Sequence, residues 1–307
     1  MKNKIPNEFE IYQKIKLTEG YKITQKINTF YLSTYIFKEN YTQLSTYIDI
    51  QTNLQKSQEI HFSENREELR KIQLETLRFL HNFLAAAQSL IDHTRIFVNE
   101  LYDENEMFKD EFSKKIEETF INNEIAVFIK SFRQYLQHYK APNISTVTNL
   151  QMIEGKFERK VMISIEDLLK FSGWRSLAKK FILKHDKNID LQFVTRNYYS
   201  TVNDFYSWFS DRQNQIHKKE FDEMEKYRLQ MIDAHIESTI RNFIKNKEYS
   251  KENFDNEITE VMGDFEKKAF SNFDIESKFK YVMSICRNKK IVLKHNEILI
   301  FRKRYCR

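Results

Sequence analysis

An arginine and a histidine near the end of one expected helix carry the strongest chemical signal in the sequence. Arg133 is followed by four residues and then His138 in the segment FIKSFRQYLQHYKAP. Histidine is the side chain that titrates near neutrality, so His138 could act as a general base or a general acid. The guanidinium group of Arg133 offers a fixed fork of donors for negatively charged phosphate oxygens. The pair therefore indicates proton transfer at a phosphate group without a metal.

The same residues resemble a known family. Arg133, four residues and His138 near a helix end are similar to the R-x4-6-H motif of the HEPN superfamily, and the upstream segment HNFLAAAQSLIDHTR resembles what precedes that motif. The resemblance spans about residues 65–142. It implies a helical bundle, and a metal-independent endoribonuclease of toxin or phage-defence type with RNA as substrate and an antitoxin or defence-system partner. Gln134 holds the place directly after the arginine, where the family often has Asn, Asp or His.

Helix geometry restricts how this pair could work. Five residues at 100° each place Arg133 and His138 about 140° apart on an ideal helix. Either the last turn opens before Pro142, or a two-fold homodimer brings two helix ends together. A surface pair on the helix, or a buried and hydrogen-bonded histidine, remains the alternative. Three residues on the preceding long helix are expected beside the pair as supporting groups or as a structural salt bridge: Asp92, His93 and Arg95.

Positive charge is concentrated at the C-terminal end of a chain whose net charge is +6. Such a local field could attract a polyanion, or it could form an ordinary solvated surface. The candidate nucleic-acid-binding residues are Lys289, Lys290, Lys294, Arg302, Lys303 and Arg304.

The elements that must position these residues are mainly helices. Four glycines and two prolines in 307 residues leave little material for the turns of a many-stranded fold. Leucine, alanine, isoleucine and valine recur at helical spacing over residues 66–102, which predicts one long helix. Apolar positions indicate further helices in residues 7–58 and from about Asp190 to Lys247. The spacing of the aromatic residues between Tyr198 and Phe209 favours core packing over the stacking of exposed bases.

Two short segments depart from helical spacing. Residues 144–165 are rich in β-branched residues around Glu154 and Gly155, which predicts a β-hairpin. Residues 290–301 place Asn296 between two apolar runs, which predicts a second small hairpin. We therefore expect an all-α fold with one or two small hairpins. Its two domains would be a HEPN-like helical bundle over residues 1–142 and a hairpin with a long-helix region over residues 143–307.

Several classes of protein are disfavoured by what the sequence lacks. It has no glycine-rich phosphate loop, and its eight histidines are never paired at helical spacing, so we expect no cofactor and no metal. No apolar run approaches the length of a membrane span, and two isolated cysteines suit a reducing, cytoplasmic location. The leading hypothesis is the endoribonuclease. The alternative is a non-catalytic helical scaffold or sensor that binds a protein or nucleic-acid partner.

Overall fold

The chain forms two compact helical units. The computed structural model describes residues 8–53, 60, 65–151 and 156–306. Unit 1 combines Met1–Lys22 with Ile216–Arg307, and unit 2 comprises Ile23–Gln215. The compact units thus divide the chain differently from the two expected domains, because the boundary expected after residue 142 falls inside unit 2. The mostly helical class is confirmed, and none of the described helices is long and apolar enough to span a membrane.

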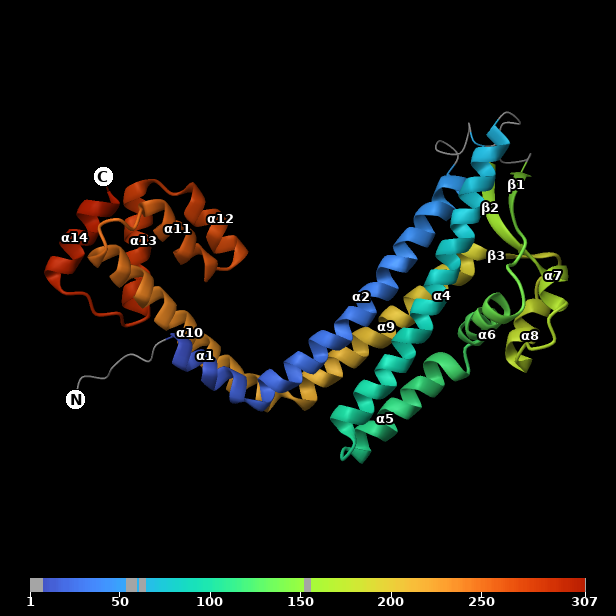
Figure 1. Cartoon of the computed structure of the whole chain (residues 1–307), viewed down its shortest axis with the longest axis horizontal. Coiled ribbons are helices and arrows are strands. Elements are labelled where there is room, and N and C mark those ends of the chain that lie inside the picture. Colours follow the sequence, from blue (N-terminus) through green and yellow to red (C-terminus); the bar gives the residue numbers. More distant parts are fainter. Residues whose placement is uncertain (1–7, 54–59, 61–64, 152–155, 307) are drawn as a thin grey trace. The chain divides into compact units, whose positions relative to one another are not determined.

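Three long helices form the frame of unit 2. They are α2 (Glu19–Thr52), α4 (Arg66–Tyr102) and α9 (Leu191–Ile216). Figure 1 shows the parts of these helices that belong to unit 2 side by side. Aromatic rings join them: Phe37 of α2 stacks on Phe83 of α4 at 5.3 Å, and Tyr41 of α2 stacks on Tyr199 of α9 at 3.8 Å. The helix expected over residues 66–102 is confirmed as α4, whose buried side chains recur every three or four residues.

A shorter helical segment covers one side of this frame. It consists of α5 (Glu106–Ile116), the five-residue π-helix η2 (Glu117–Ile121) and α6 (Glu124–His138). Asparagine side chains begin both α-helices, since Asn105 accepts from the N–H of Phe108, and Asn123 accepts from the N–H groups of Ile125 and Ala126. The capping of α6 fixes where its apolar face starts, and that face packs toward α4 and α8 (Ser176–Leu183).

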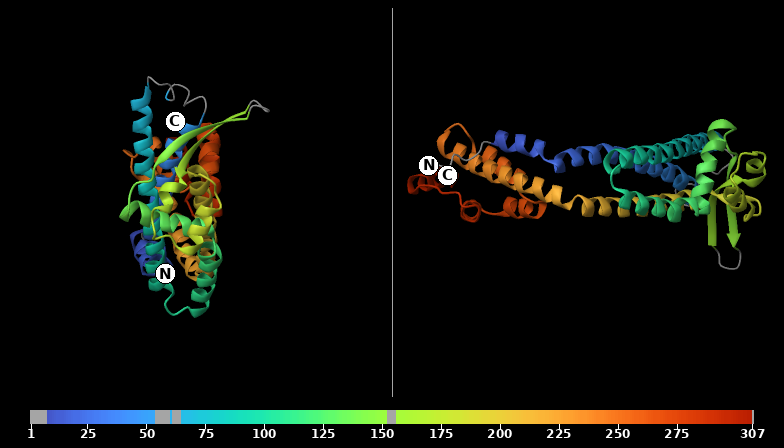
Figure 2. Two further views of the ribbon diagram at one scale, coloured as in Figure 1. Left: turned by 90° about the vertical axis from the view of Figure 1, so that its right-hand side faces the viewer. Right: turned by 90° about the horizontal axis from the view of Figure 1, so that it is seen from below.

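A small antiparallel sheet completes unit 2. Its strands are β1 (Ile144–Gln151), β2 (Lys156–Ser164) and β3 (Asn188–Asp190), in the order β1-β2-β3. Ile163 of β2 pairs with Ile144 on one side and with Ile189 on the other. The right-hand view of Figure 2 shows the strands running across the direction of the long helices. The hairpin expected over residues 144–165 is confirmed, although Glu154 and Gly155 lie outside the described residues. The short helix α7 (Ile165–Leu169) follows β2.

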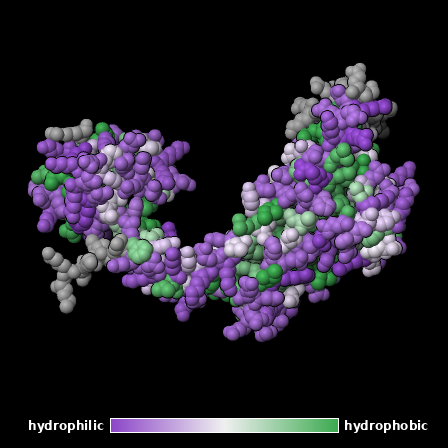
Figure 3. Space-filling model, in the orientation of Figure 1, coloured by the Kyte–Doolittle hydropathy of each residue, from purple (hydrophilic) through white to green (hydrophobic). Residues whose placement is uncertain are grey.

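Unit 1 pairs an N-terminal helix with a C-terminal bundle. The helix α1 (Glu8–Leu17) packs on α10 (Lys218–Lys245). The other helices are α11 (Lys251–Glu260), α12 (Asp264–Asn272), α13 (Ile275–Asn288) and α14 (His295–Tyr305). The rings of Phe243, Phe254, Phe301 and Tyr305 meet in the core of this bundle. Figure 3 shows that the outer surface of these helices is mainly hydrophilic on the face drawn.

The second hairpin expected over residues 290–301 is wrong, because its latter half belongs to the helix α14. The carboxylate of Glu297 accepts a hydrogen bond from the backbone N–H of Lys294 at 2.7 Å, which caps the first turn. Phe301 and Tyr305 then lie four residues apart on the buried face of the helix. The apolar runs on either side of Asn296 therefore reflect helical burial and not the pairing of two strands.

Candidate functional site

The structure keeps Arg133 and His138 on one regular helix. Helix α6 continues to His138, and the N–H of Tyr139 still donates to the carbonyl of Tyr135 at 2.9 Å. The two side chains therefore project about 140° apart, as on an ideal helix. His138 is exposed, Arg133 and Gln134 are half-buried, and the buried Nε of Arg133 has no hydrogen-bond partner in the described part of the chain. Within one chain, the pair does not share a face.

The expected supporting residues on α4 point in different directions. The Nδ1 of His93 lies 2.6 Å from the hydroxyl of Ser33, so His93 faces α2. Asp92 and Arg95 form an ion pair at 3.5 Å with both side chains more than half exposed. Arg95 also lines a pocket on another side of α4. Of these three side chains, only that of Arg95 lines the pocket.

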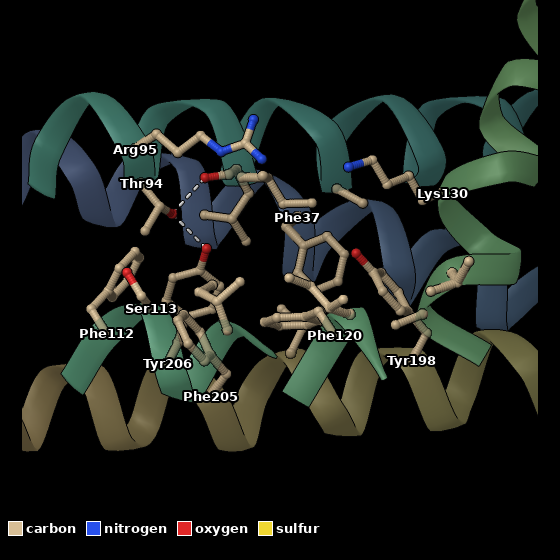
Figure 4. A pocket seen from close by; sticks show the side chains of 18 of the residues that line it. Phe37, Thr94, Arg95, Phe112, Ser113, Phe120, Lys130, Tyr198, Phe205 and Tyr206 are labelled. Carbon is tan, nitrogen blue, oxygen red and sulfur yellow. Dashed lines mark hydrogen bonds between the residues drawn. The ribbon is translucent and has the colours of Figure 1, made fainter. Parts of the chain in front are cut away.

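A pocket of about 470 Å³ lies inside unit 2 between the long helices and the segment formed by α5, η2 and α6. Its walls are mostly hydrocarbon and aromatic, and Figure 4 shows the rings gathered around it. The volume falls within the range that is usual for small-molecule sites. The aromatic residues of the lining are Phe37, Phe112, Phe120, Tyr198, Phe205 and Tyr206.

Helical spacing explains how these rings come to one place. On α9, Tyr198, Val202 and Phe205 follow each other at intervals of four and three, so they share one face. The π-helix η2 places Phe120 edge-on against Phe205, with ring centroids 5.1 Å apart. From α5, Phe112 approaches the same ring at 6.0 Å. The aromatic segment expected to pack in the core thus does so, and part of its surface also faces the pocket.

The mouth of the pocket is cationic. Arg95 of α4, Lys130 of α6 and Arg175, the residue before α8, all line it. Figure 4 shows Arg95 and Lys130 on one side of the pocket and the rings of Phe112 and Phe205 on the other. Among the described residues, neither Lys130 nor Arg175 has an ion-pair partner. The pocket therefore combines an apolar interior with positive charge that Asp92, the ion-pair partner of Arg95, neutralises only in part.

Lys130 lies in an environment that disfavours its charge. Burial lowers the pKa of its ammonium group, the positive charges of Arg175 and Arg95 lower it further, and Asp92 acts in the opposite direction. Perturbed pKa values are common at functional sites, including sites that bind a ligand of opposite charge. An anion at the mouth would restore the pKa of Lys130 toward its ordinary value.

The polar groups inside the pocket are uncharged. The hydroxyl of Thr94 donates to the carbonyl of Leu90 at 2.6 Å, and it lies 2.6 Å from the hydroxyl of Tyr206. Burial raises the pKa values of Tyr198 and Tyr206, so both phenols keep their protons at neutral pH. The interior can therefore accept an apolar body with little competition from charged groups.

The expected nucleic-acid-binding residues in unit 1 are partly occupied within the chain. Lys289 pairs with Asp233 at 2.6 Å, and Arg302 pairs with Glu276 at 2.9 Å. Arg304 donates to backbone carbonyl groups at and beyond the end of α10, including that of Tyr249 at 2.8 Å. The remaining residues of this set lie at the turn before α14 or on its exposed face: Lys290, Lys294 and Lys303.

Sequence reasoning missed Lys130 and Arg175. Lys130 lies one turn after Ala126 on the same face of α6. The only local sign that it lines a pocket is a lysine among apolar positions. Arg175 follows Trp174 in a loop, and nothing in the neighbouring sequence indicates that its charge acts on Lys130 of α6. Three separate segments supply the mouth of the pocket, so the tertiary fold was needed to find it.

No metal site accompanies the pocket: in residues 8–53, 60, 65–151 and 156–306, no three histidine, cysteine or acidic side chains are grouped as a metal ion would require. Comparison with known proteins gives no match, because no family model fits the chain and no curated protein or solved structure resembles it.

Proposed function

We propose that unit 2 is a binding module for a small anionic amphiphile, and that it acts as a sensor of that molecule. The observation that carries this proposal is the aromatic pocket whose mouth holds Arg95, Lys130 and Arg175. An apolar body would fill the pocket, and an acidic group would meet the three cations. This arrangement follows the general pattern of ligand sites, in which apolar walls supply affinity and a few polar groups fix the orientation.

Apolar burial and charge would contribute separately to affinity. Each buried methylene contributes about 0.8 kcal/mol, so Kd should fall about fourfold per added methylene until the pocket is full. The acidic group would remove the repulsion that acts on Lys130 from Arg175 and Arg95. Charge-assisted hydrogen bonds from guanidinium groups are also stronger than neutral ones.

A binding role fits the lining better than a catalytic one. In the described part of the chain, the residues that line the pocket include no histidine, cysteine, aspartate or glutamate. Histidine and carboxylate bases and thiol nucleophiles are therefore missing from its described walls. The hydroxyl of Thr94 is already engaged with Leu90 and Tyr206.

The test is calorimetry of the full chain with saturated carboxylates of increasing length, from octanoate to dodecanoate. We expect binding that tightens with chain length, about a tenfold loss in Lys130→Met, and a comparable loss when Val127→Trp fills part of the pocket. Val127 is half-buried and lines the pocket, so the larger ring can enter it. Lys114→Met is the matched control, since Lys114 is exposed on α5 and does not line the pocket. Binding that is absent at millimolar ligand, or equal in wild type and Val127→Trp, contradicts the proposal.

A metal-independent endoribonuclease is our second proposal, and the free Nε of Arg133 is the observation that favours it. A buried donor without a partner is uncommon in proteins, and a phosphate oxygen would satisfy it once movement of the neighbouring side chains exposed it. Because α6 separates Arg133 from His138 by about 140°, the active form would be a homodimer in which His138 of one copy meets Arg133 of the other.

The ribonuclease proposal has a direct test. The purified chain with EDTA should cleave RNA, and His138→Ala should abolish the cleavage. The protein should also elute as a dimer in size-exclusion chromatography with light scattering. A monomer that leaves every RNA intact, including tRNA, removes the support for a toxin or phage-defence nuclease.

A further inference from the structure

We propose that the acidic group of the pocket ligand is a phosphomonoester on a hydrocarbon body, and not a carboxylate. This inference rests on the proposed function, because it names the chemical class of the molecule that the pocket binds. Three observations carry it: the charge at the mouth, the arrangement of the guanidinium groups, and the small number of polar groups along the aromatic wall.

The charge at the mouth matches a dianion. The charges that act on Lys130 are the two guanidinium groups of Arg95 and Arg175 and the carboxylate of Asp92. Together with Lys130 itself they leave two positive charges without a counter-ion. A carboxylate would neutralise one of these, whereas a phosphomonoester carries about −1.5 to −2 at pH 7. Only the phosphate would leave the mouth nearly neutral.

The donors at the mouth come from separate directions. Arg95 projects from the C-terminal part of α4, and Arg175 occupies the N-cap position of α8. A phosphomonoester offers three terminal oxygens that two forks and an ammonium group can approach from different sides, whereas both oxygens of a carboxylate lie in one plane.

The wall favours a hydrocarbon body over a nucleoside. A purine or pyrimidine carries several donors and acceptors, and each would need a partner on burial. The hydroxyls of Thr94 and Tyr206 are bonded to each other, those of Ser113 and Tyr198 are the only other hydroxyls among the described lining residues, and the rest of the wall is ring and aliphatic carbon. A nucleoside base in this pocket would therefore lose most of its hydrogen bonds to water without replacement, whereas an alkyl or aryl group would lose none.

The test compares ligands that share one chain and differ in charge. Dodecyl phosphate, its monomethyl ester, dodecanoate and adenosine monophosphate are titrated into the full chain below their micellar concentrations, with circular dichroism to show that the fold persists. At pH 7.5 we expect dodecyl phosphate to bind at least tenfold more tightly than the singly charged methyl ester and dodecanoate. At pH 5 the phosphate carries about one charge, because its second pKa is about 6. Its higher affinity relative to the methyl ester should then nearly vanish.

Variants separate this inference from the proposed function. Arg175→Gln should weaken the binding of dodecyl phosphate about tenfold and the binding of the methyl ester less. Lys179→Gln should change the affinity for neither ligand, because Lys179 is exposed on α8 and does not line the pocket. If dodecanoate or the methyl ester binds as tightly as dodecyl phosphate, the phosphomonoester is refuted and the binding module stands. Tighter binding of adenosine monophosphate refutes the hydrocarbon body. If none of the four ligands binds, the proposed function itself fails.

Discussion

Replacing Lys130 by methionine should stabilise the unliganded protein while it weakens ligand binding. The ammonium group is partly buried, and Arg175 and Arg95 repel it more than Asp92 attracts it. Methionine keeps an unbranched side chain and a similar helix propensity, so the substitution removes the charge with little other change in α6. A lysine with a purely structural ion pair would show the opposite result, since its loss would lower stability.

The expected gain is modest but measurable. Removing an unfavourable charge usually contributes about 0.5–2 kcal/mol to the free energy of unfolding. Unit 2 spans Ile23–Gln215, a size for which 1 kcal/mol shifts Tm by about 2–4 °C. We therefore expect a rise in Tm of roughly 1–8 °C for Lys130→Met. The control Lys114→Met should stay within about 0.5 kcal/mol of wild type, as surface substitutions usually do.

The sign of the pH dependence gives a second check. The pKa of Lys130 is lowered in the folded protein, whereas in the unfolded chain it keeps a value of about 10.4. Between these two values the unfolded state binds more protons, so the stability of wild type rises with pH there. The advantage of Lys130→Met should be complete at neutral pH and should shrink as the pH rises through the lowered pKa. Thermal unfolding followed by circular dichroism measures both effects. An unchanged or lower Tm of a folded Lys130→Met would refute this account of the mouth.

Two further substitutions, each with a control variant, test the fold of unit 1. Gly20→Ala should destabilise unit 1 by about 1–3 kcal/mol. The added Cβ on α2 would lie 2.3 Å from the carbonyl oxygen of Glu220 on α10, so these two helices would have to move apart. In Gly263→Ala the added Cβ has its nearest neighbour at 4.0 Å, so thermal unfolding should change little. Arg304→Gln should cost about 1.5–3 kcal/mol through its lost charged hydrogen bonds, whereas the exposed Lys303→Gln should not. If urea denaturation gives equal stability for these two variants, Arg304 is not a structural cap and is available to a polyanion.

The long-range pattern of the sequence predicted most helices and one hairpin. The helix over residues 66–102 could be predicted because its apolar periodicity continues without interruption. The error at α14 has a physical cause: apolar residues on both sides of Asn296 suit a hairpin by alternation, and the decisive contact is the capping bond from Lys294 to Glu297. The break between α9 and α10 at His217 also had no proline or glycine to mark it.

The candidate site could be predicted only in part. Arg95 was expected beside a functional helix, and it does line the pocket mouth, but the α6 residue that lines the mouth with it is Lys130 and not His138. Motif reasoning selects residues that are close in sequence, such as Arg133 and His138. The pocket depends on side chains from six helical segments and a loop residue, and no local pattern in the chain contains that information.

The hydroxyl pair in the pocket restricts the ligand in a further way. The hydroxyl group of Thr94 has one proton, which it donates to the carbonyl of Leu90. In its 2.6 Å contact with Tyr206 the phenol must therefore be the donor. Both protons are then committed, and the pair can present only lone pairs to the pocket. A ligand alcohol at this depth could donate to them, whereas a ketone or ether would bury acceptor against acceptor. One wall of the pocket can thereby distinguish two oxidation levels of the same carbon atom.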